Sequence, residues 1–396
     1  MKPLRITGGR VLAGSALLET ELLVVDAHID AIGADRTPRD ATEVDARDLL
    51  VLPGIVDVHG DAFERQLMPR PGVVFDPAVA LVEVDRQLLA NGITSACHAL
   101  TVSWEPGLRG VAAAAGFVDA LDARREGLLA DHRLQIRWEL FALDAVERVA
   151  AWLEATPVPA LAFNDHLGDI RSQVEYGGGE KLRGWAERAG LSAENYVELA
   201  ATLERRADEV PGAIESLAAR ARELGAPLLS HDDADAAARR RYRALGATIA
   251  EFPMSAEAAG EARSAGEPIV LGAPNVVRGG SQSGALDARA AIERDLCTVL
   301  ATDYYYPAPF AAVAALVGGG TLSLERAWPL VSANPAAALG LDDRGRLEPG
   351  LRADLLLVEH EGGVPRAVLA TVAAGELTWH GAGLRERLDR RFAPVP

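Results

Sequence analysis

The pattern of apolar and polar positions divides the chain into three parts. Residues 1–50 hold short alternating runs separated by Gly and Asp, which predict strands and turns. The end of the chain has the same pattern, with strands predicted at 354–358 and 376–380 after a turn-rich link at 345–350. Between these ends, short apolar runs alternate with long Ala, Leu, Glu and Arg stretches of helical period, which predicts alternating strands and helices.

Eight apolar runs in the middle part are predicted to be strands. Eight strands with intervening helices favour a parallel sheet of the α/β class, closed at this length into a (β/α)8 TIM-like barrel. An open doubly wound sheet is the rival fold, disfavoured because no Gly-x-Gly-x-x-Gly follows the first strand. The runs are Ile55–His59, Ile93–His98, Leu134–Leu140, Ala160–Asp165, Ala226–His231, Ala247–Phe252, Pro268–Ala273 and Thr298–Asp303.

Metal-binding residue types stand at the ends of several predicted strands. The segment Val51–Asp61 is interpreted as a short apolar strand that ends in His59-Gly60-Asp61. Side chains at i and i+2 of a strand lie on one side, so His59 and Asp61 converge. In a barrel the carboxyl ends of all strands meet at one face. The alternative is that these residues are separate polar caps. The further candidate ligands are Glu139, His166, His231 and Asp303.

The number of ligands predicts two divalent ions. His59, Asp61 and Glu139 would hold one ion, and Glu139, His166 and His231 the other, with Glu139 bridging. No Lys stands at a barrel strand end to bridge them instead. Imidazole and carboxylate ligands suit zinc, and they also suit manganese, iron or cobalt.

Other residues are predicted to bind and cleave the substrate. Asp303 would take a proton from the attacking water and pass it to the leaving group, although a strand-end cap is the alternative role. The stretch 271–284 after the seventh strand is interpreted as a Gly-rich loop that binds an anion, with Arg278, Asn275 and Ser281 as its candidate contacts. A stiff loop after the first strand adds Arg70.

Composition narrows the classes of partner. The net charge of −17 over 396 residues argues against a nucleic-acid or anionic-membrane surface, while local cations still allow an anionic small-molecule substrate. The two cysteines, Cys97 and Cys297, lie in apolar runs and are expected to be buried free thiols. No signal peptide or membrane span is evident, so we expect a cytoplasmic protein, and the sequence leaves a homo-oligomer open.

Two motifs of this chain resemble the amidohydrolase superfamily: 52–59 near the start and 347–355 near the end. Within it, the closest resemblance is to the diphosphatases that act on α-D-ribose 1-methylphosphonate 5-triphosphate in the carbon–phosphorus lyase pathway. The segments that carry this resemblance are His59-Gly60-Asp61, Pro69-Arg70-Pro71, Ser230–Asp233, Ile249–Pro253, Gly272–Ser281 and Thr302–Tyr305.

The resemblance implies a fold and a reaction. Residues 1–53 and 345–396 would form a small β-sandwich domain, and 54–344 a metal-dependent hydrolase barrel with a helical insertion at about 175–215. The implied reaction is hydrolysis of the triphosphate to the 5-phosphate and pyrophosphate. After His166 the diphosphatases have Thr/Ser-Pro-Gly-Gln-Arg-Gln; here Leu167–Gln173 stands, in which Arg171 keeps a cation for the substrate. The rival functions are a metal hydrolase of a cyclic amide, lactone or other phosphate ester, and a catalytically silent scaffold.

Overall fold

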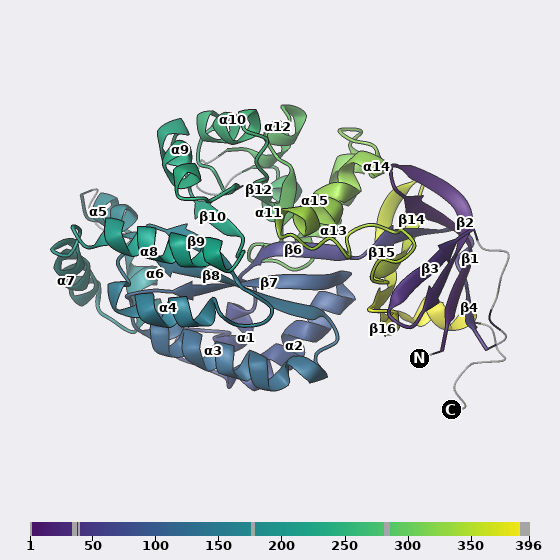
Figure 1. Ribbon diagram of the computed structural model, residues 1–396, viewed down its shortest axis with the longest axis horizontal. Helices are drawn as coiled ribbons and strands as arrows, with labels where there is room; N and C mark the ends of the chain where they lie inside the picture. The colour runs from purple at the N-terminus through teal and green to yellow at the C-terminus, as the bar shows by residue number, and fades with distance from the viewer. Residues whose placement is uncertain (1, 34–37, 39, 176–178, 281–285, 389–396) are drawn as a thin grey trace.

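Both ends of the chain contribute strands to one mixed sheet, at the right of Figure 1. The computed structural model describes residues 2–33, 38, 40–175, 179–280 and 286–388. The strands of this sheet are β1 (Leu4–Ala13), β2 (Ala16–Val25), β3 (His28–Ile32), β4 (Thr42–Asp45), β5 (Leu49–Pro53), β14 (Leu355–Glu361), β15 (Val364–Ala373) and β16 (Glu376–His380). Their order is β16-β15-β14-β5-β1-β2-β3, and β4 pairs with β1. The antiparallel pairing of β5 with β14 therefore joins the two chain ends.

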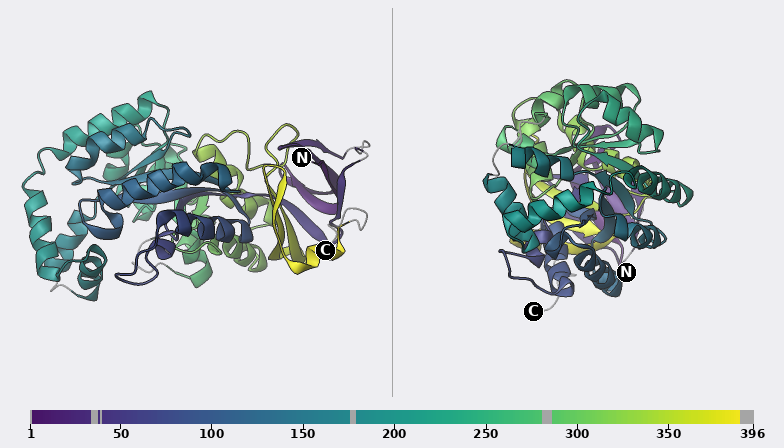
Figure 2. Two further views of the ribbon diagram at one scale, coloured as in Figure 1. Left: turned by 90° about the horizontal axis from the view of Figure 1, so that it is seen from below. Right: turned by 90° about the vertical axis from the view of Figure 1, so that its left-hand side faces the viewer.

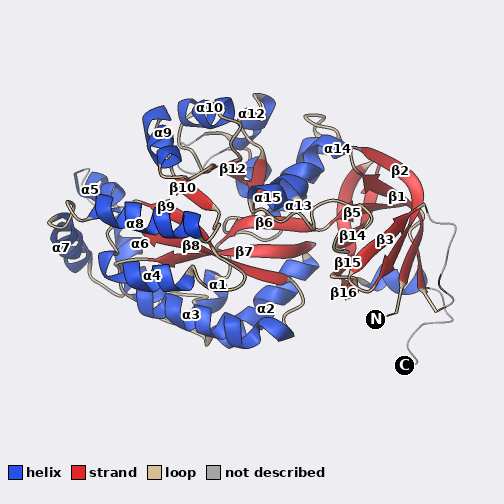
Figure 3. Ribbon diagram, viewed as in Figure 1, coloured by secondary structure: helices blue, strands red, loops and turns tan. Residues whose placement is uncertain are grey.

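The second sheet is a nearly closed barrel of parallel strands in sequence order, as predicted. In Figure 3 its strands lie among the helices that cover them. Every residue of the first two strands is buried, which is typical of parallel strands covered on both faces. The strands are β6 (Ile55–Gly60), β7 (Ile93–Val102), β8 (Asp131–Glu139), β9 (Ala160–Asn164), β10 (Leu228–His231), β11 (Ile249–Glu251), β12 (Ile269–Gly272) and β13 (Val299–Ala301).

Helices connect the barrel strands. Asp or Ser side chains accept backbone N–H groups at the N-termini of five of them: Asp76, Ser192, Asp235, Ser255 and Asp287. Among the described residues, no helix is long and apolar enough to cross a membrane. The helices are α1 (Glu64–Leu67), α2 (Pro77–Ala90), α3 (Val111–Arg124), α4 (Val146–Trp152), α5 (Leu167–Glu175), α6 (Glu180–Ala189), α7 (Ala193–Glu204), α8 (Val210–Glu223), α9 (Ala236–Ala244), α10 (Ala256–Ser264), α11 (Ala273–Arg278), α12 (Ala288–Glu293), α13 (Ala308–Gly318), α14 (Leu324–Ala327) and α15 (Ala333–Ala338).

An insertion of helices stands between β9 and β10, over the end of the molecule opposite the terminal sheet (Figures 1 and 2). It has a small apolar core of its own, built from α5, α6 and α7. Leu182, Ala186 and Ala189 of α6 lie at i, i+4 and i+7 and are buried in that core. The residue before each of these three, Lys181, Trp185 and Arg188, lies on the adjoining face of α6 and lines a pocket beside the barrel.

The segment interpreted as one short strand, 51–61, is divided between the two sheets. Residues up to Pro53 belong to β5 of the terminal sheet, and β6 of the barrel begins at Ile55. Gly54 joins them where a Cβ would collide with the side chain of Thr94, so only glycine fits. The chain therefore passes from one unit to the other with almost no linker.

Candidate metal centre

The first and last barrel strands meet at the centre of the site. The N–H of Asp303 donates to the carbonyl oxygen of His59 at 2.9 Å, and the N–H of Asp61 donates to the carbonyl oxygen of Asp303 at 2.9 Å. Asp303 adopts a left-handed conformation with φ of 55°, which Asp tolerates better than most residues. These bonds bring a ligand atom from each of the three side chains within 4.8 Å of one another.

A buried carboxylate stabilises this junction between the ends of β6 and β13, which is called the seam below. Asp57 is 1% exposed and accepts the backbone N–H of Thr302 at 2.9 Å and its hydroxyl at 2.5 Å. The backbone N–H of His59 also donates to Asp57, at 3.3 Å. Burial raises the pKa of Asp57 to about 6, although these donors act in the opposite direction.

A second group of ligand atoms lies beside the first and shares His59 with it. It consists of His59, His231 at the end of β10 and Glu251 at the end of β11, again within 4.8 Å. Nδ1 of His59 lies 3.0 Å from Oε1 of Glu251 but lacks the alignment of a hydrogen bond. Within the described part of the chain, Oε2 of Glu251 is also buried without a hydrogen-bond partner, while its Oε1 accepts a hydrogen bond from Nε2 of Gln135 at 2.6 Å. Buried donor atoms left over in this way fit a bound ion.

The protonation states of these groups suit a cation. Burial lowers the pKa of His59 to about 3, so its imidazole is neutral and able to bind metal. Burial raises the pKa of Glu251 to about 7, and burial together with the charge of Asp61 raises the pKa of Asp303 to about 7. A divalent ion would favour the ionised form of both acids.

Glu139 and His166 form a pair at the edge of the site. Nδ1 of His166 lies 2.6 Å from Oε1 of Glu139, and the backbone N–H of His166 donates to Oε2 at 3.2 Å. Burial alone would raise the pKa of Glu139, but the charge and hydrogen bonds of His166 outweigh it and lower the pKa to about 2. Among the described residues, neither belongs to the groups above. Their predicted roles as ligands, with Glu139 as the bridge, stay predictions.

Two arginines, Arg137 and Arg109, lie beside the candidate ligands. Neither was predicted from the sequence as a site residue. Arg137 is 4% exposed; its Nη2 lies 3.4 Å from Nε2 of His231 and its Nη1 lies 3.8 Å from Oδ2 of Asp61. Its Nε is buried and has no hydrogen-bond partner among the residues that the structure describes. Arg109 makes two bonds of 2.8 Å to Glu64 and lies 3.9 Å from Asp61. The available signal for Arg137 was its position two residues before Glu139, on the same side of the strand.

The predicted substrate contacts lie around the centre at different distances from it. The stretch predicted as a loop is a helix over 273–278, so Asn275 and Arg278 belong to α11, and Ser281 falls outside the described residues. Arg278 is exposed and donates to the hydroxyl of Tyr304 at 3.3 Å. The exposed Arg70 lies between α1 and α2, and Arg171 of α5 points to Glu204 at 3.8 Å with 69% of its side chain exposed.

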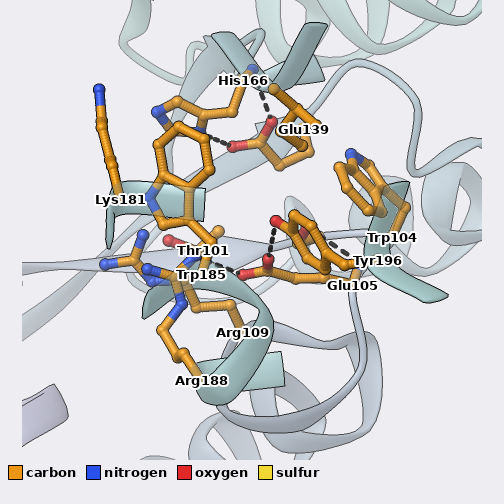
Figure 4. Close-up of a pocket in the computed structure, with 12 residues that line it drawn as sticks. Thr101, Trp104, Glu105, Arg109, Glu139, His166, Lys181, Trp185, Arg188 and Tyr196 are labelled. Carbon is orange, nitrogen blue, oxygen red and sulfur yellow. Dashed lines mark hydrogen bonds and ion pairs between the residues drawn. The ribbon is translucent and has the colours of Figure 1, made fainter. Parts of the chain in front are cut away.

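A pocket of about 540 Å³, open in part to solvent, adjoins Glu139 and His166 (Figure 4). Thr101 and the loop that follows β7 line one side, and the insertion lines the other. Its cations are Arg109, Lys181 and Arg188, and its large aromatic side chains are Trp104, Trp185 and Tyr196. The pocket is thus both cationic and aromatic next to the candidate metal ligands.

Comparison with known proteins agrees with this geometry. Residues 50–378 match the model of the amidohydrolase family. The chain is 32% identical over 321 residues, 78% of its length, to alpha-D-ribose 1-methylphosphonate 5-triphosphate diphosphatase of Escherichia coli (strain K12), of which 83% is covered. It is 29% identical over 377 residues to imidazolonepropionase of Paracoccus denitrificans (strain Pd 1222), covering 86% of this chain and 88% of that one.

The fold is also that of solved amidohydrolase structures. N-isopropylammelide isopropylaminohydrolase from Burkholderia multivorans ATCC 17616 superimposes with a TM-score of 0.66 and 18% identity, covering 96% of this chain and 99% of the other. The family match covers the barrel strands and most strands of the terminal sheet, and the superposition covers nearly the whole of both chains. The chain belongs to the amidohydrolase family.

Proposed function

We propose that this chain hydrolyses the phosphoric anhydride of α-D-ribose 1-methylphosphonate 5-triphosphate, giving the 5-phosphate and pyrophosphate. The 32% identity to the diphosphatase of Escherichia coli supports this substrate. Whichever substrate it takes, the chain is an amidohydrolase-family hydrolase with a candidate metal site of His and carboxylate side chains.

The observation that carries the proposal is the buried guanidinium of Arg137. It lies among the candidate ligands, with its Nη1 3.8 Å from Oδ2 of Asp61, and its Nε has no hydrogen-bond partner in the part of the chain that the structure describes. A buried cation whose ion pair is as long as 3.8 Å is costly, and an anionic substrate oxygen in direct contact would lower that cost. Guanidinium and phosphoryl oxygens pair well in geometry and charge. A neutral cyclic amide would bring no charge to this position.

The proposed role of each residue follows from its position in the site. His59, Asp61, His231, Glu251 and Asp303 offer the ligands of the two groups. With Glu139 and His166, we propose that they hold two divalent ions, zinc in the first instance. A bound ion would polarise a phosphoryl oxygen and acidify a water molecule.

We assign the proton transfer to Asp303. Its carboxylate lies beside Asp61 at the mouth of the seam, partly exposed. We propose that it accepts the proton of the attacking water and donates one to the leaving pyrophosphate. Arg137 and Arg109 would orient the phosphoryl oxygens between them and stabilise the charge that they gain.

The test is release of pyrophosphate from the triphosphate by metal-loaded protein, compared with nucleoside triphosphates and a cyclic amide. Asp303→Asn should retain most of its metal and lose activity by about three orders of magnitude or more, a size seen when a central catalytic group is removed. Arg137→Met should lower turnover of the triphosphate strongly. If the parent protein cleaves only the cyclic amide, the proposal fails.

The second candidate is that cyclic amide chemistry. It is favoured by the similarity to imidazolonepropionase, which extends over 86% of this chain. With a neutral cyclic amide as the substrate, Arg137→Met should have little effect on turnover, because that substrate carries no anion to pair with the guanidinium.

A further inference from the structure

The pocket of Figure 4 contains one of the chain's only two lysines. The sequence has Lys2 and Lys181, and all its other basic residues apart from histidine are arginines. Lys181 lines the pocket with its ammonium 4.9 Å from the centre of the Trp185 ring. A flexible ammonium at this position is therefore an exception to the arginine-rich composition of the chain.

The insertion presents its cations on one helical face. Lys181, Trp185 and Arg188 of α6 are at i, i+4 and i+7 and all line the pocket, while the adjoining face of the helix packs in the core of the insertion. Figure 4 shows Arg109 and Arg188 on the side where Lys181 stands, with Trp104 across from them. The insertion and the barrel thus supply cations to one wall.

The acids of this pocket are already paired. Glu105 accepts Nη2 of Arg188 at 2.9 Å and the hydroxyl of Tyr196 at 2.7 Å, and Glu139 is paired with His166. Nε of Arg188 is buried without a partner among the described residues. Arg109 is likewise paired with Glu64, so the ammonium of Lys181 and the unused donor of Arg188 are what this wall offers first to an anion from outside.

We propose that Lys181, Arg188 and Arg109 bind the diphosphate part of a triphosphate substrate, which makes α6 the element that selects the length of the phosphate chain. This inference rests on the proposed function. Arg109 lies 3.9 Å from Asp61, so the wall begins at the candidate metal centre and leads outward to Lys181. The diphosphate would leave along this wall as pyrophosphate after cleavage.

Pyridoxal 5′-phosphate provides a direct test on the metal-loaded protein. Its aldehyde condenses with a lysine amine, releasing water, and borohydride reduces the resulting imine to a stable secondary amine. Peptide mass spectrometry then reads the label at Lys181 and at Lys2, which serves as the internal control. Pyrophosphate, with metal in excess, should suppress labelling of Lys181 at least tenfold and leave that of Lys2 unchanged. Equal labelling of Lys181 with and without pyrophosphate would overturn the inference.

Kinetics with two substrates gives the second test. Lys181→Met should lower kcat/KM for the 5-triphosphate by about tenfold or more, as loss of a charge-assisted bond does, and lower it much less for the 5-diphosphate. Arg183→Met is the matched control, because Arg183 is on the same helix, exposed and outside the pocket lining.

The two proposals fail in different ways. If the triphosphate is cleaved but Lys181→Met affects both substrates equally, the inference fails and the proposed function stands. If no phosphoric anhydride is cleaved and pyrophosphate still protects Lys181, the anion site stands and the proposed function fails.

Discussion

Replacing Asp57 by Ala should destabilise the protein by about 3–5 kcal/mol. Asp57 accepts the N–H and the hydroxyl of Thr302 at 2.9 and 2.5 Å, and the N–H of His59 at 3.3 Å. A hydrogen bond to a charged group contributes about 1.5–3 kcal/mol, and the two shorter bonds account for most of the estimate. Alanine would also leave two backbone N–H groups buried without their carboxylate acceptor.

The assay is urea unfolding of metal-free protein, so that metal binding does not add to the measured stability. Asp57→Asn keeps one acceptor oxygen and should lose about half as much as Asp57→Ala. Combined with Thr302→Val, Asp57→Ala should show a coupling of about 1 kcal/mol or more. A loss below about 1 kcal/mol for Asp57→Ala would refute the reasoning, because the seam would then not depend on this carboxylate.

The parent protein and Asp57→Asn together test how the contribution of Asp57 to stability depends on pH. Burial raises the pKa of Asp57 from 3.8 to about 6 in the folded protein, so protonation favours folding. This contribution is complete below pH 3.8 and is lost as the pH rises through 6, an effect of roughly 3 kcal/mol. The stability of the parent relative to Asp57→Asn should therefore fall between about pH 4 and 7. A difference that grew with pH would contradict the assignment.

Three other outcomes follow from the packing. Gly272→Ala should lower turnover, because its Cβ would lie 3.1 Å from Oδ2 of Asp303; Gly260→Ala, with nothing within 4 Å, is the control, and equal rates would contradict this. Burial raises the pKa of both Cys97 and Cys297 to about 12, so a disulfide exchange reagent should titrate neither thiol in the native protein and both in denaturant. Removing metal with a chelator should lower the midpoint of thermal unfolding, since the ligands tie several strands together; an unchanged midpoint would exclude a bound structural ion.

The barrel could be predicted because its strands are buried on both faces. Such strands are continuous apolar runs, and all eight appear in the sequence as predicted. The terminal sheet was predicted less completely. No strand was predicted at β15 or at the short β4, and the segment 51–61 was interpreted as one strand although it contains parts of both β5 and β6. Gly54 marks that boundary, but its reason, the close approach of Thr94, is a contact between distant segments.

The site was predictable where a polar residue follows an apolar run, as with His59 and His231. Glu251 has the same position after β11 and was missed as a ligand, although its run was identified. Arg137 and the pocket face of α6 could not be derived in this way. Whether a side chain within a strand or a polar insertion faces the centre depends on tertiary packing, which residue types alone do not encode.

The seam between β6 and β13 has a consequence for synthesis of the chain. Asp57 and Thr302 are 245 residues apart, so a nascent chain can carry His59 and His231 long before Asp303 has left the ribosome. Until then one of the two ligand groups is incomplete and the barrel lacks its closing strand. The terminal sheet is also completed late, because β14, which pairs with β5, is synthesised after all the barrel strands. Contacts between such distant segments form slowly, so the candidate ligand group of His59, Asp61 and Asp303 is completed in the last stage of folding, after release of nearly the whole chain.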